Sequence, residues 1–157
     1  MNTIAKLAGV GVGTVYRHFP SRNALLEALS MDGFKRLLAS SESAADEEDP
    51  AIALRELLLG ALLIEIDDIG LAKVLELPAE ECMQTTAELR EGIEAAAVQV
   101  MDRAASAGVI RADIGRGDLR RLVGGVSHAV RMNPAKTPEE AGRYLDILLN
   151  GLMAGTA

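Results

Sequence analysis

Apolar residues recur every three or four positions along most of this chain, which is the period of an α-helix rather than of a strand. The pattern predicts helices over residues 21–39, 51–66, 71–77, 79–107 and 118–132, and a last one from residue 138 onward. The segment 51–66 is apolar on nearly every side, so we expect its neighbours to bury it. Aromatic residues make up only 3% of the chain while Ala, Leu and Glu are abundant, which also favours helix over strand. We therefore predict an all-α fold.

A break in the pattern divides the chain into two parts. Residues 40–50 are polar and acidic and end in Asp49-Pro50, which predicts a loop or a frayed helix end. We expect a small N-terminal domain over residues 1–40 and a helical body over residues 41–157. The helix that Ser21 caps would connect them.

The first thirty residues contain two short helices joined by a glycine turn. Gly9 occupies the position where the chain must turn, a left-handed conformation that suits glycine, and Gly11 precedes a helix over residues 12–18. Phe19-Pro20 ends that helix, because the residue before a proline is disfavoured in the helical region. Two helices with this tight turn form a helix-turn-helix, whose second member lies in the major groove of DNA.

The residues of this segment resemble the DNA-binding domain of the TetR family of bacterial transcriptional regulators. The resemblance implies a helix-turn-helix head on a helical body that binds a small-molecule effector and forms a homodimer. The implied function is ligand-responsive regulation of transcription, repression rather than activation, with release from a palindromic operator when the effector binds. Three groups carry the resemblance between Ile4 and Leu29: Ala8-Gly9-Val10, Gly13-Thr14-Val15-Tyr16-Arg17-His18-Phe19, and Arg22 with Ala24-Leu25-Leu26.

DNA contacts are predicted near the start of the second motif helix. Val12 can meet a thymine methyl group, Thr14 can hydrogen-bond a base edge or a phosphate, and Gly13 lets the helix approach closely. The resemblance places phosphate contacts at Tyr16 and His18. With three basic residues added, the expected set is Lys6, Val12, Gly13, Thr14, Tyr16, Arg17, His18 and Arg22.

One departure from the family concerns the start of the chain. Family members carry a helix ahead of this motif, whereas here Met1 directly precedes the first motif helix. We therefore expect a shortened head in which Ile4, Leu7, Leu25 and Leu29 lose part of their cover, at roughly 1.5–3 kcal/mol for each side chain left exposed. The alternative function that follows is a TetR-like sensing or scaffold protein that has lost DNA binding.

Charge is distributed unevenly along the chain. The net charge is −7, but residues 1–36 carry five basic and two acidic residues, a net of +3, so the remainder carries −10. A basic end on an acidic body is expected when only that end meets phosphates. The sequence has no long apolar run, no signal-peptide pattern and a single cysteine, Cys82, so we expect a cytoplasmic protein with no membrane partner.

An effector would lie among the helices of the body. Alternatives stay open for its lining: methionine at helical spacing also fits a core, His128 also fits a core or an interface, and Glu65 also fits a solvent-facing gap. The scarcity of aromatic side chains argues against flat ring ligands. The expected lining is Leu62, Glu65, Ile66, Met83, Met101 and His128.

The last two helices are the expected dimer interface. A palindromic operator requires two reading helices about 34 Å apart, which a monomer cannot supply. The resemblance implies a four-helix interface, and Gly124-Gly125 would allow its helices to approach closely. The expected contact residues are Leu122, Gly124, Gly125, Val126, Leu145, Leu148 and Leu152.

Catalysis is the rival class of function. The two histidines, His18 and His128, are far apart in the sequence, and no Glu-x-x-His pair suggests a metal site in a bundle. Cys82 has no histidine or basic residue beside it, and the glycines at 9, 11 and 13 follow a helix and lack the lysine of a phosphate-binding loop. We predict no enzyme activity and neither a metal nor a cofactor.

Overall fold

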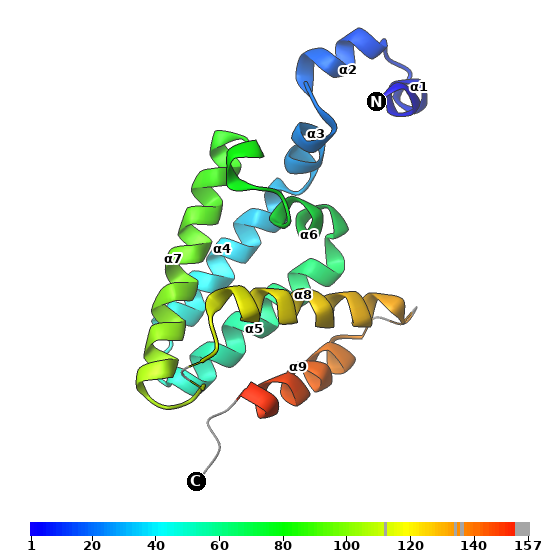
Figure 1. Cartoon of the computed structure of the whole chain (residues 1–157). Coiled ribbons are helices and arrows are strands. Elements are labelled where there is room, and N and C mark those ends of the chain that lie inside the picture. The colour runs from blue at the N-terminus through cyan, green and yellow to red at the C-terminus, as the bar shows by residue number, and fades with distance from the viewer. Residues whose placement is uncertain (112, 134, 136, 153–157) are drawn as a thin grey trace.

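The computed structural model describes residues 1–111, 113–133, 135 and 137–152, and in these residues the regular structure is helical, with no strand. The predicted all-α fold class is confirmed (Figure 1). A short 3-10 helix, η1 (Ala79–Glu81), lies between α6 (Ile69–Leu75) and α7 (Gln84–Ser106). The helices are α1 (Asn2–Ala8), α2 (Val12–His18), α3 (Arg22–Leu29), α4 (Met31–Asp46), α5 (Pro50–Asp67), α6 (Ile69–Leu75), α7 (Gln84–Ser106), α8 (Arg116–Met132) and α9 (Pro138–Leu152).

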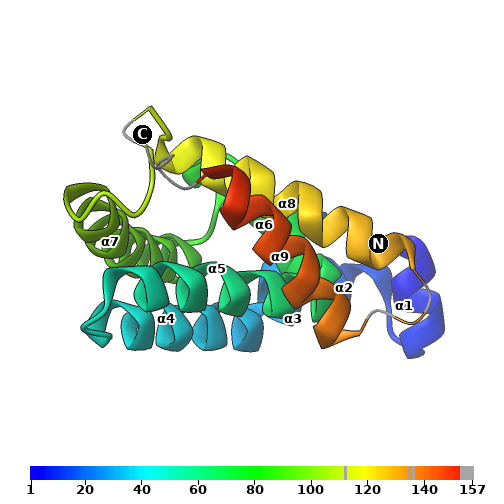
Figure 2. The same ribbon diagram turned by 90° about the horizontal axis from the view of Figure 1, so that it is seen from below.

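The body is built around α5, as its all-round apolar sequence predicts. This helix contacts α4, α6, α7, α8 and α9, and the view from below shows α4 on one side of it and α8 and α9 on the other (Figure 2). Asp49 caps its start by accepting hydrogen bonds from the N–H groups of Ala51 and Ile52. The buried apolar side chains of α5 are Ala53, Leu54, Leu57, Leu58, Leu62 and Ile66.

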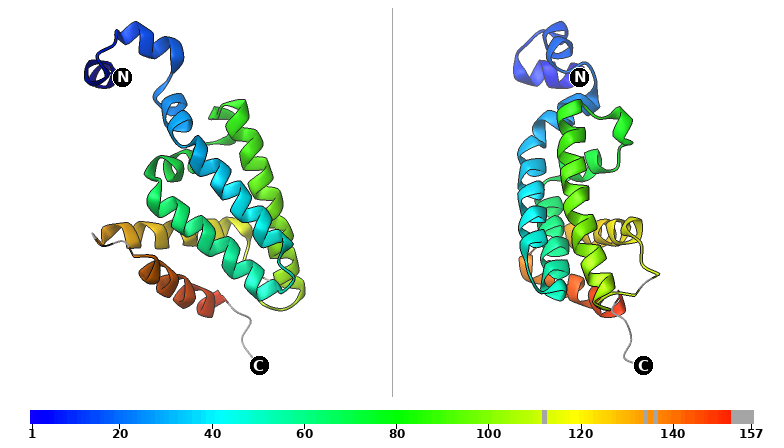
Figure 3. Two further views of the ribbon diagram at one scale, coloured as in Figure 1. Left: turned by 180° about the vertical axis from the view of Figure 1, so that it is seen from behind. Right: turned by 90° about the vertical axis from the view of Figure 1, so that its left-hand side faces the viewer.

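The first three helices form a head that projects beyond one end of the body. Figure 3 shows α1 and α2 standing clear of the body helices, while α4 runs from the head down the length of the body. The head makes its main contacts through α3, which lies against α6 and α4. The side chains that could touch DNA are therefore placed far from the C-terminal helices (Figure 1).

The connection between head and body differs from the predicted single helix over residues 21–39. Ser21 does cap α3, accepting a hydrogen bond from the N–H of Ala24, but α3 ends at Leu29 and a new helix begins at Met31. Ser30 lies at the break, with φ −95° and ψ 6°, and its buried hydroxyl donates to Asp68 at the start of α6. This contact is remote in sequence, which is why the local pattern did not reveal the break.

The predicted loop over residues 40–50 begins later than expected, because α4 continues to Asp46. Ala44 and Ala45 are buried, and Arg103 of α7 donates hydrogen bonds to the carbonyls of Ala45 (2.9 Å) and Glu47 (2.7 Å). A cation at the C-terminal end of a helix satisfies carbonyl groups that have no partner within the helix. The acidic sequence of this turn therefore stays helical through contacts with α7.

Helix starts in the second half were predicted with mixed success. The last helix begins at Pro138 as predicted, and Thr137 caps it by accepting a hydrogen bond from the N–H of Glu140. The helix predicted from residue 118 begins earlier, at Arg116, so Asp118 lies inside α8, where its carboxylate accepts a hydrogen bond from the N–H of Gly115. The long helix expected from residue 79 begins at Gln84, after η1.

Candidate nucleic-acid interface and ligand cavity

The second helix of the head rests on the first through a small contact. Ala5 of α1 and Val15 of α2 are buried, and Gly9 between the two helices has a φ of 67°, the predicted left-handed conformation. The remaining surface of α2 is free. Of the predicted DNA contacts only Thr14 is half-buried; Lys6, Val12, Gly13, Tyr16, Arg17, His18 and Arg22 are exposed.

Positive charge dominates the exposed surface of the head. Lys6, Arg17 and Arg22 are exposed, whereas Glu27, the one carboxylate among residues 1–31, is only 1% exposed. Glu27 faces the body, where it accepts a hydrogen bond of 2.7 Å from the N–H of Met83 at the start of α7. The Glu27 carboxylate therefore does not repel a polyanion at the exposed surface of the head. Its hydrogen bond connects α3 to α7 instead.

Several apolar side chains of the head lack cover, as the sequence suggested. Leu7 is 84% exposed and Leu29 is 71% exposed, while Ile4 is also exposed and Leu25 is half-buried. These side chains leave apolar surface of the head in contact with water.

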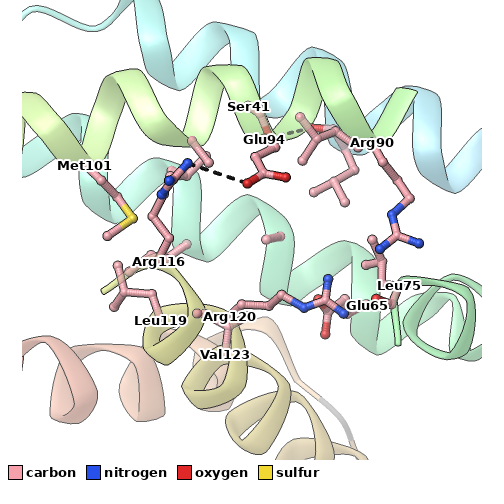
Figure 4. A pocket seen from close by; sticks show the side chains of 17 residues that line it. Ser41, Glu65, Leu75, Arg90, Glu94, Met101, Arg116, Leu119, Arg120 and Val123 are labelled. Carbon is pink, nitrogen blue, oxygen red and sulfur yellow. Dashed lines mark hydrogen bonds and ion pairs between the residues drawn. The ribbon is translucent and has the colours of Figure 1, made fainter. Parts of the chain in front are cut away.

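A cavity of about 280 Å³ lies in the body between α4, α5, α7 and α8, next to the end of α6. Most of its wall is apolar, with side chains such as Leu37, Leu57, Ile93 and Leu119. Figure 4 shows charged side chains around this wall, with Arg90 and Arg120 on either side of Leu75 and with Arg116 directed toward Glu94. Volume and lining fit a small-molecule site, because such sites combine apolar walls with a few polar groups.

The predicted pocket residues divide into two groups. Glu65 and Met101 line the cavity. Leu62 and Ile66 do not, because they are buried within the core that α5 forms. Met83 is exposed at the start of α7, and His128 is exposed on α8, so neither reaches the cavity.

Three arginines of the lining were missed in the sequence, although a signal for them exists. Arg116, Arg120 and Val123 are spaced by four and three residues and so share one face of α8. Arg90 and Glu94 are likewise four residues apart on α7. Charged residues on the same helical stripe as core residues mark polar groups inside the packing, and no prediction was made from this spacing.

Arg90 also corrects the description of Cys82. The sequence places no basic residue beside this cysteine, but the Arg90 guanidinium lies 3.1 Å from its sulfur. The same nitrogen, Nη1, donates to the carbonyl of Leu77 at 2.9 Å. Arg90 therefore holds the turn between α6 and α7 together.

Burial raises the pKa of the Glu65 carboxyl above its ordinary value, although the positive charges of Arg120 and Arg131 act in the opposite direction. In the unfolded chain Glu65 loses its proton near its ordinary pKa of about 4.3. The folded chain retains that proton to higher pH. Between these two pKa values ionisation therefore favours unfolding, and the stability that Glu65 contributes at low pH is lost as the pH rises.

Replacing Glu65 with glutamine is expected to remove this loss. The free energy of unfolding of Glu65→Gln, minus that of the wild type, should increase as the pH rises from about 4 to 8. Urea denaturation at a series of pH values measures the difference. Glu56→Gln, an exposed change on the same helix, is the control. A difference for Glu65→Gln that does not change with pH would contradict the pKa shift.

The predicted dimer residues are also divided between the surface and the core. Leu145 and Leu152 are buried within the single chain, so their side chains are already covered. Leu122 and Gly125 are exposed, and Gly124, Val126 and Leu148 are half-buried. A stripe of small and apolar residues on α8 thus remains uncovered: Leu122, Gly125, Ala129 and Met132.

Metal binding and membrane insertion find no support in the described part of the chain. Within it no three His, Cys, Asp or Glu side chains gather where they could hold a metal ion. None of the helices described combines the length and the hydropathy that crossing a bilayer requires.

The fold and the head together define a class of protein, a helix-turn-helix regulator with a helical body. Residues 1–29 match the model of bacterial regulatory proteins of the tetR family, and residues 49–154 match that of the C-terminal domain of SbtR-like transcriptional regulators. The chain belongs to the TetR family of transcriptional regulators.

Solved structures of other TetR proteins share this fold. The TetR transcriptional regulator SCO0520 of Streptomyces coelicolor is 34% identical, with 98% of this chain and 86% of that chain covered and a TM-score of 0.62. PfmR of Thermus thermophilus, a TetR family regulator, is 24% identical, with coverage of 96% and 84% and a TM-score of 0.64. A regulatory protein of the tetR family from Rhodococcus RHA1 is 18% identical, with coverage of 99% and 86% and a TM-score of 0.61. No curated protein matches the chain significantly.

Proposed function

We propose that this protein is a homodimeric repressor that binds a palindromic operator and is released from it by a small-molecule effector. The observation that carries the proposal is the arrangement of head and body. The end of the molecule that bears α2 is exposed and positively charged, and α4 joins it to a body that contains a cavity. We assign DNA binding to residues 1–40 and effector binding and dimerisation to residues 41–157. Such a regulator acts in the cytoplasm, where the bacterial chromosome lies.

The DNA contacts that we propose follow from the position of each side chain on the head. Val12, Gly13 and Thr14 lie in the first turn of α2, where a reading helix meets base edges in the major groove. The other exposed polar and basic side chains would contact phosphates, which fix the orientation of the helix without reading sequence. These are Lys6, Tyr16, Arg17, His18 and Arg22.

In a dimer the second chain supplies the second reading helix. The uncovered stripe on α8 supports a dimer interface on that helix. A two-fold axis brings the same surface of both chains together, so a stripe of small and apolar residues can pack on its own copy. Apart from the backbone of α8 itself, no atom of the described residues lies within 4 Å of a Cβ atom built on Gly124 or Gly125. The space over these glycines would allow the two α8 helices to approach closely.

Replacing Gly125 with alanine tests this interface. In a free chain alanine should stabilise α8 by about 1 kcal/mol, because glycine is a poor helix former. In a closely packed dimer the added methyl group should separate the helices and raise the dimer dissociation constant by at least about tenfold. Sedimentation equilibrium measures this constant. Gly13→Ala, also at an exposed helical glycine, is the control, and equal dimer affinities for the two variants would contradict the proposed interface.

Effector release would act through the contacts between head and body. Ser30 at the break between α3 and α4 is bound to Asp68 at the start of α6, and Glu27 of α3 is bound to the start of α7. A ligand that shifts α6 or α7 would therefore move the head. Such a regulator has one conformation whose head spacing fits the operator and another whose spacing does not. A ligand shifts the chain to the second conformation if it binds that conformation more tightly by only a few kcal/mol.

A second candidate function is a TetR-like sensing or scaffold protein that has lost DNA binding. The exposure of Leu7 and Leu29 favours it, because a head with uncovered leucines is less well supported. The two candidates differ in one property, which is affinity for DNA.

A mobility-shift experiment on the DNA upstream of the gene separates the candidates. The repressor function predicts a shifted band whose affinity falls steeply with salt, because three exposed cations on each head displace counterions from phosphates. The slope of log K against log salt should be about −5 for the six cations of a dimer. A chain that is folded and dimeric but shifts no DNA at low salt would favour the sensing function.

A further inference from the structure

Two guanidinium groups beside the cavity form no ion pair with a carboxylate among the described residues. Arg90 donates from Nη1 to the carbonyls of Leu77 (2.9 Å) and Val74 (3.5 Å), and Arg120 donates from Nη2 to the carbonyl of Leu75. Both groups therefore hold carbonyls of residues 74–77, so they lie on either side of the same turn (Figure 4). Each arginine has five N–H donors in a planar fork, so further donors remain for a ligand.

Among the described residues, the carboxylates of the lining form no ion pair with these two groups. Glu94 forms its ion pair with Arg116, at 3.5 Å. Glu65 makes no ion pair within the described residues, although Arg120 is near enough for its positive charge to lower the pKa of the Glu65 carboxyl against the effect of burial. The lining thus contains three guanidiniums against two carboxylates, and the excess positive charge lies beside Leu75.

The rest of the cavity suits a short apolar group. Met101 and Leu119 lie at the end away from Arg90, next to the Arg116–Glu94 ion pair, and leucine, isoleucine and alanine side chains form the wall between (Figure 4). The volume of about 280 Å³ equals that of roughly nine water molecules in the liquid. A ligand of roughly ten non-hydrogen atoms therefore fits, with one end in apolar surroundings and the other beside two cations.

We propose that the cavity binds a short amphipathic carboxylate, whose carboxylate group lies between Arg90 and Arg120 and whose alkyl chain of about eight carbons lies against the apolar wall. Planar guanidiniums bind carboxylates through paired, charge-assisted hydrogen bonds. The alkyl chain would remove apolar surface of the wall from water. A cationic ligand would instead face the excess of arginines.

The same two arginines connect this ligand to the head. They hold the carbonyls at the C-terminal end of α6, and Asp68 at its other end holds Ser30 at the break between α3 and α4. A carboxylate that draws Arg90 and Arg120 away from those carbonyls would free one end of α6. This consequence rests on the proposed repressor function, whereas binding of the carboxylate does not.

Calorimetric titration of the full chain with three eight-carbon probes tests the proposal without any variant. Octanoate, octan-1-ol and octylamine share one alkyl chain and differ in charge. Octanoate is expected to bind at least about tenfold more tightly than octan-1-ol, and octylamine more weakly than either. Equal affinities for octanoate and octan-1-ol, or a preference for octylamine, would overturn the proposal.

Substitutions on α8 locate the carboxylate. Arg120→Gln should weaken octanoate binding at least about tenfold and leave octan-1-ol binding unchanged. The control is Arg121→Gln, because the neighbouring Arg121 is 79% exposed in its side chain and does not line the cavity. Equal octanoate affinities for these two variants, each checked for folding by circular dichroism, would overturn the assignment.

A mobility shift with and without octanoate separates this proposal from the proposed function. Binding of octanoate without release of bound DNA would overturn effector-controlled repression and leave the ligand class standing. DNA binding by a chain that ignores octanoate in calorimetry would overturn the ligand class and leave DNA-binding regulation standing.

Discussion

Replacing Gly13 with glutamate is expected to abolish specific DNA binding while leaving the chain folded. Gly13 is exposed in the first turn of α2, and a Cβ atom built on it meets no atom of the described residues within 4 Å beyond the backbone of α2, so a longer side chain fits the free protein. A residue other than glycine should stabilise the helix by up to about 1 kcal/mol, and an acidic side chain suits a helix N-terminus. Stability should therefore be unchanged or slightly higher.

On DNA the same carboxylate would lie against phosphates and block close approach of the helix. A dimer carries the substitution twice, so we expect the dissociation constant for the operator to rise at least about 100-fold. Fluorescence anisotropy of a labelled DNA fragment measures it. Gly13→Ala, which adds one methyl group and no charge, should lose much less affinity. If Gly13→Glu bound DNA within about threefold of the wild type, α2 would not be the reading helix.

Replacing Phe34 with alanine should lower the free energy of unfolding by about 3–5 kcal/mol. Phe34 is fully buried in α4, where it packs in a small cluster with Leu37, Leu71 and Val74 of α4 and α6. This cluster lies next to the junction of head and body, because Phe34 is one turn after Ser30. The loss would be a large fraction of the 5–15 kcal/mol that typically holds a domain folded.

Urea denaturation at one fixed protein concentration measures this loss, since dimerisation makes apparent stability depend on concentration. Phe34→Leu keeps most of the apolar volume and should cost about 1.5 kcal/mol or less. If alanine were tolerated as well as leucine, the cluster would contribute little to the junction. The assignment of Phe34 to a closely packed core would then be wrong.

Local sequence signals predicted most of the elements correctly. Gly9, with no side chain to oppose a left-handed conformation, marks the turn between α1 and α2, and Gly11 precedes α2. Ser21 and Thr137 cap the helices that follow them. The all-round apolar segment of α5 is buried, because its neighbours are helices on several sides. The turn and the two caps depend on residues within one turn of the chain, and the burial of α5 follows from the apolar composition of that segment.

Contacts between distant segments were beyond the reach of those signals. The break at Ser30 depends on Asp68, which lies 38 residues away, and the last turn of α4 depends on Arg103. The cavity arginines appeared as ordinary surface charges because nothing local to Arg90 or Arg120 identifies the carbonyls that they hold. Likewise, Leu145 fits either a dimer interface or a core by its spacing, and only the packing of α9 places it in the core.

The central claim is that two copies of α2, held by one symmetric dimer, read DNA. Footprinting of the full chain on the DNA upstream of its gene tests this most directly. We predict two protected segments related by two-fold symmetry, with centres about 10 base pairs or a multiple of that apart, and no protection by Gly13→Glu. If the wild-type chain sediments as a dimer but protects no segment of this DNA at low salt, the claim is contradicted.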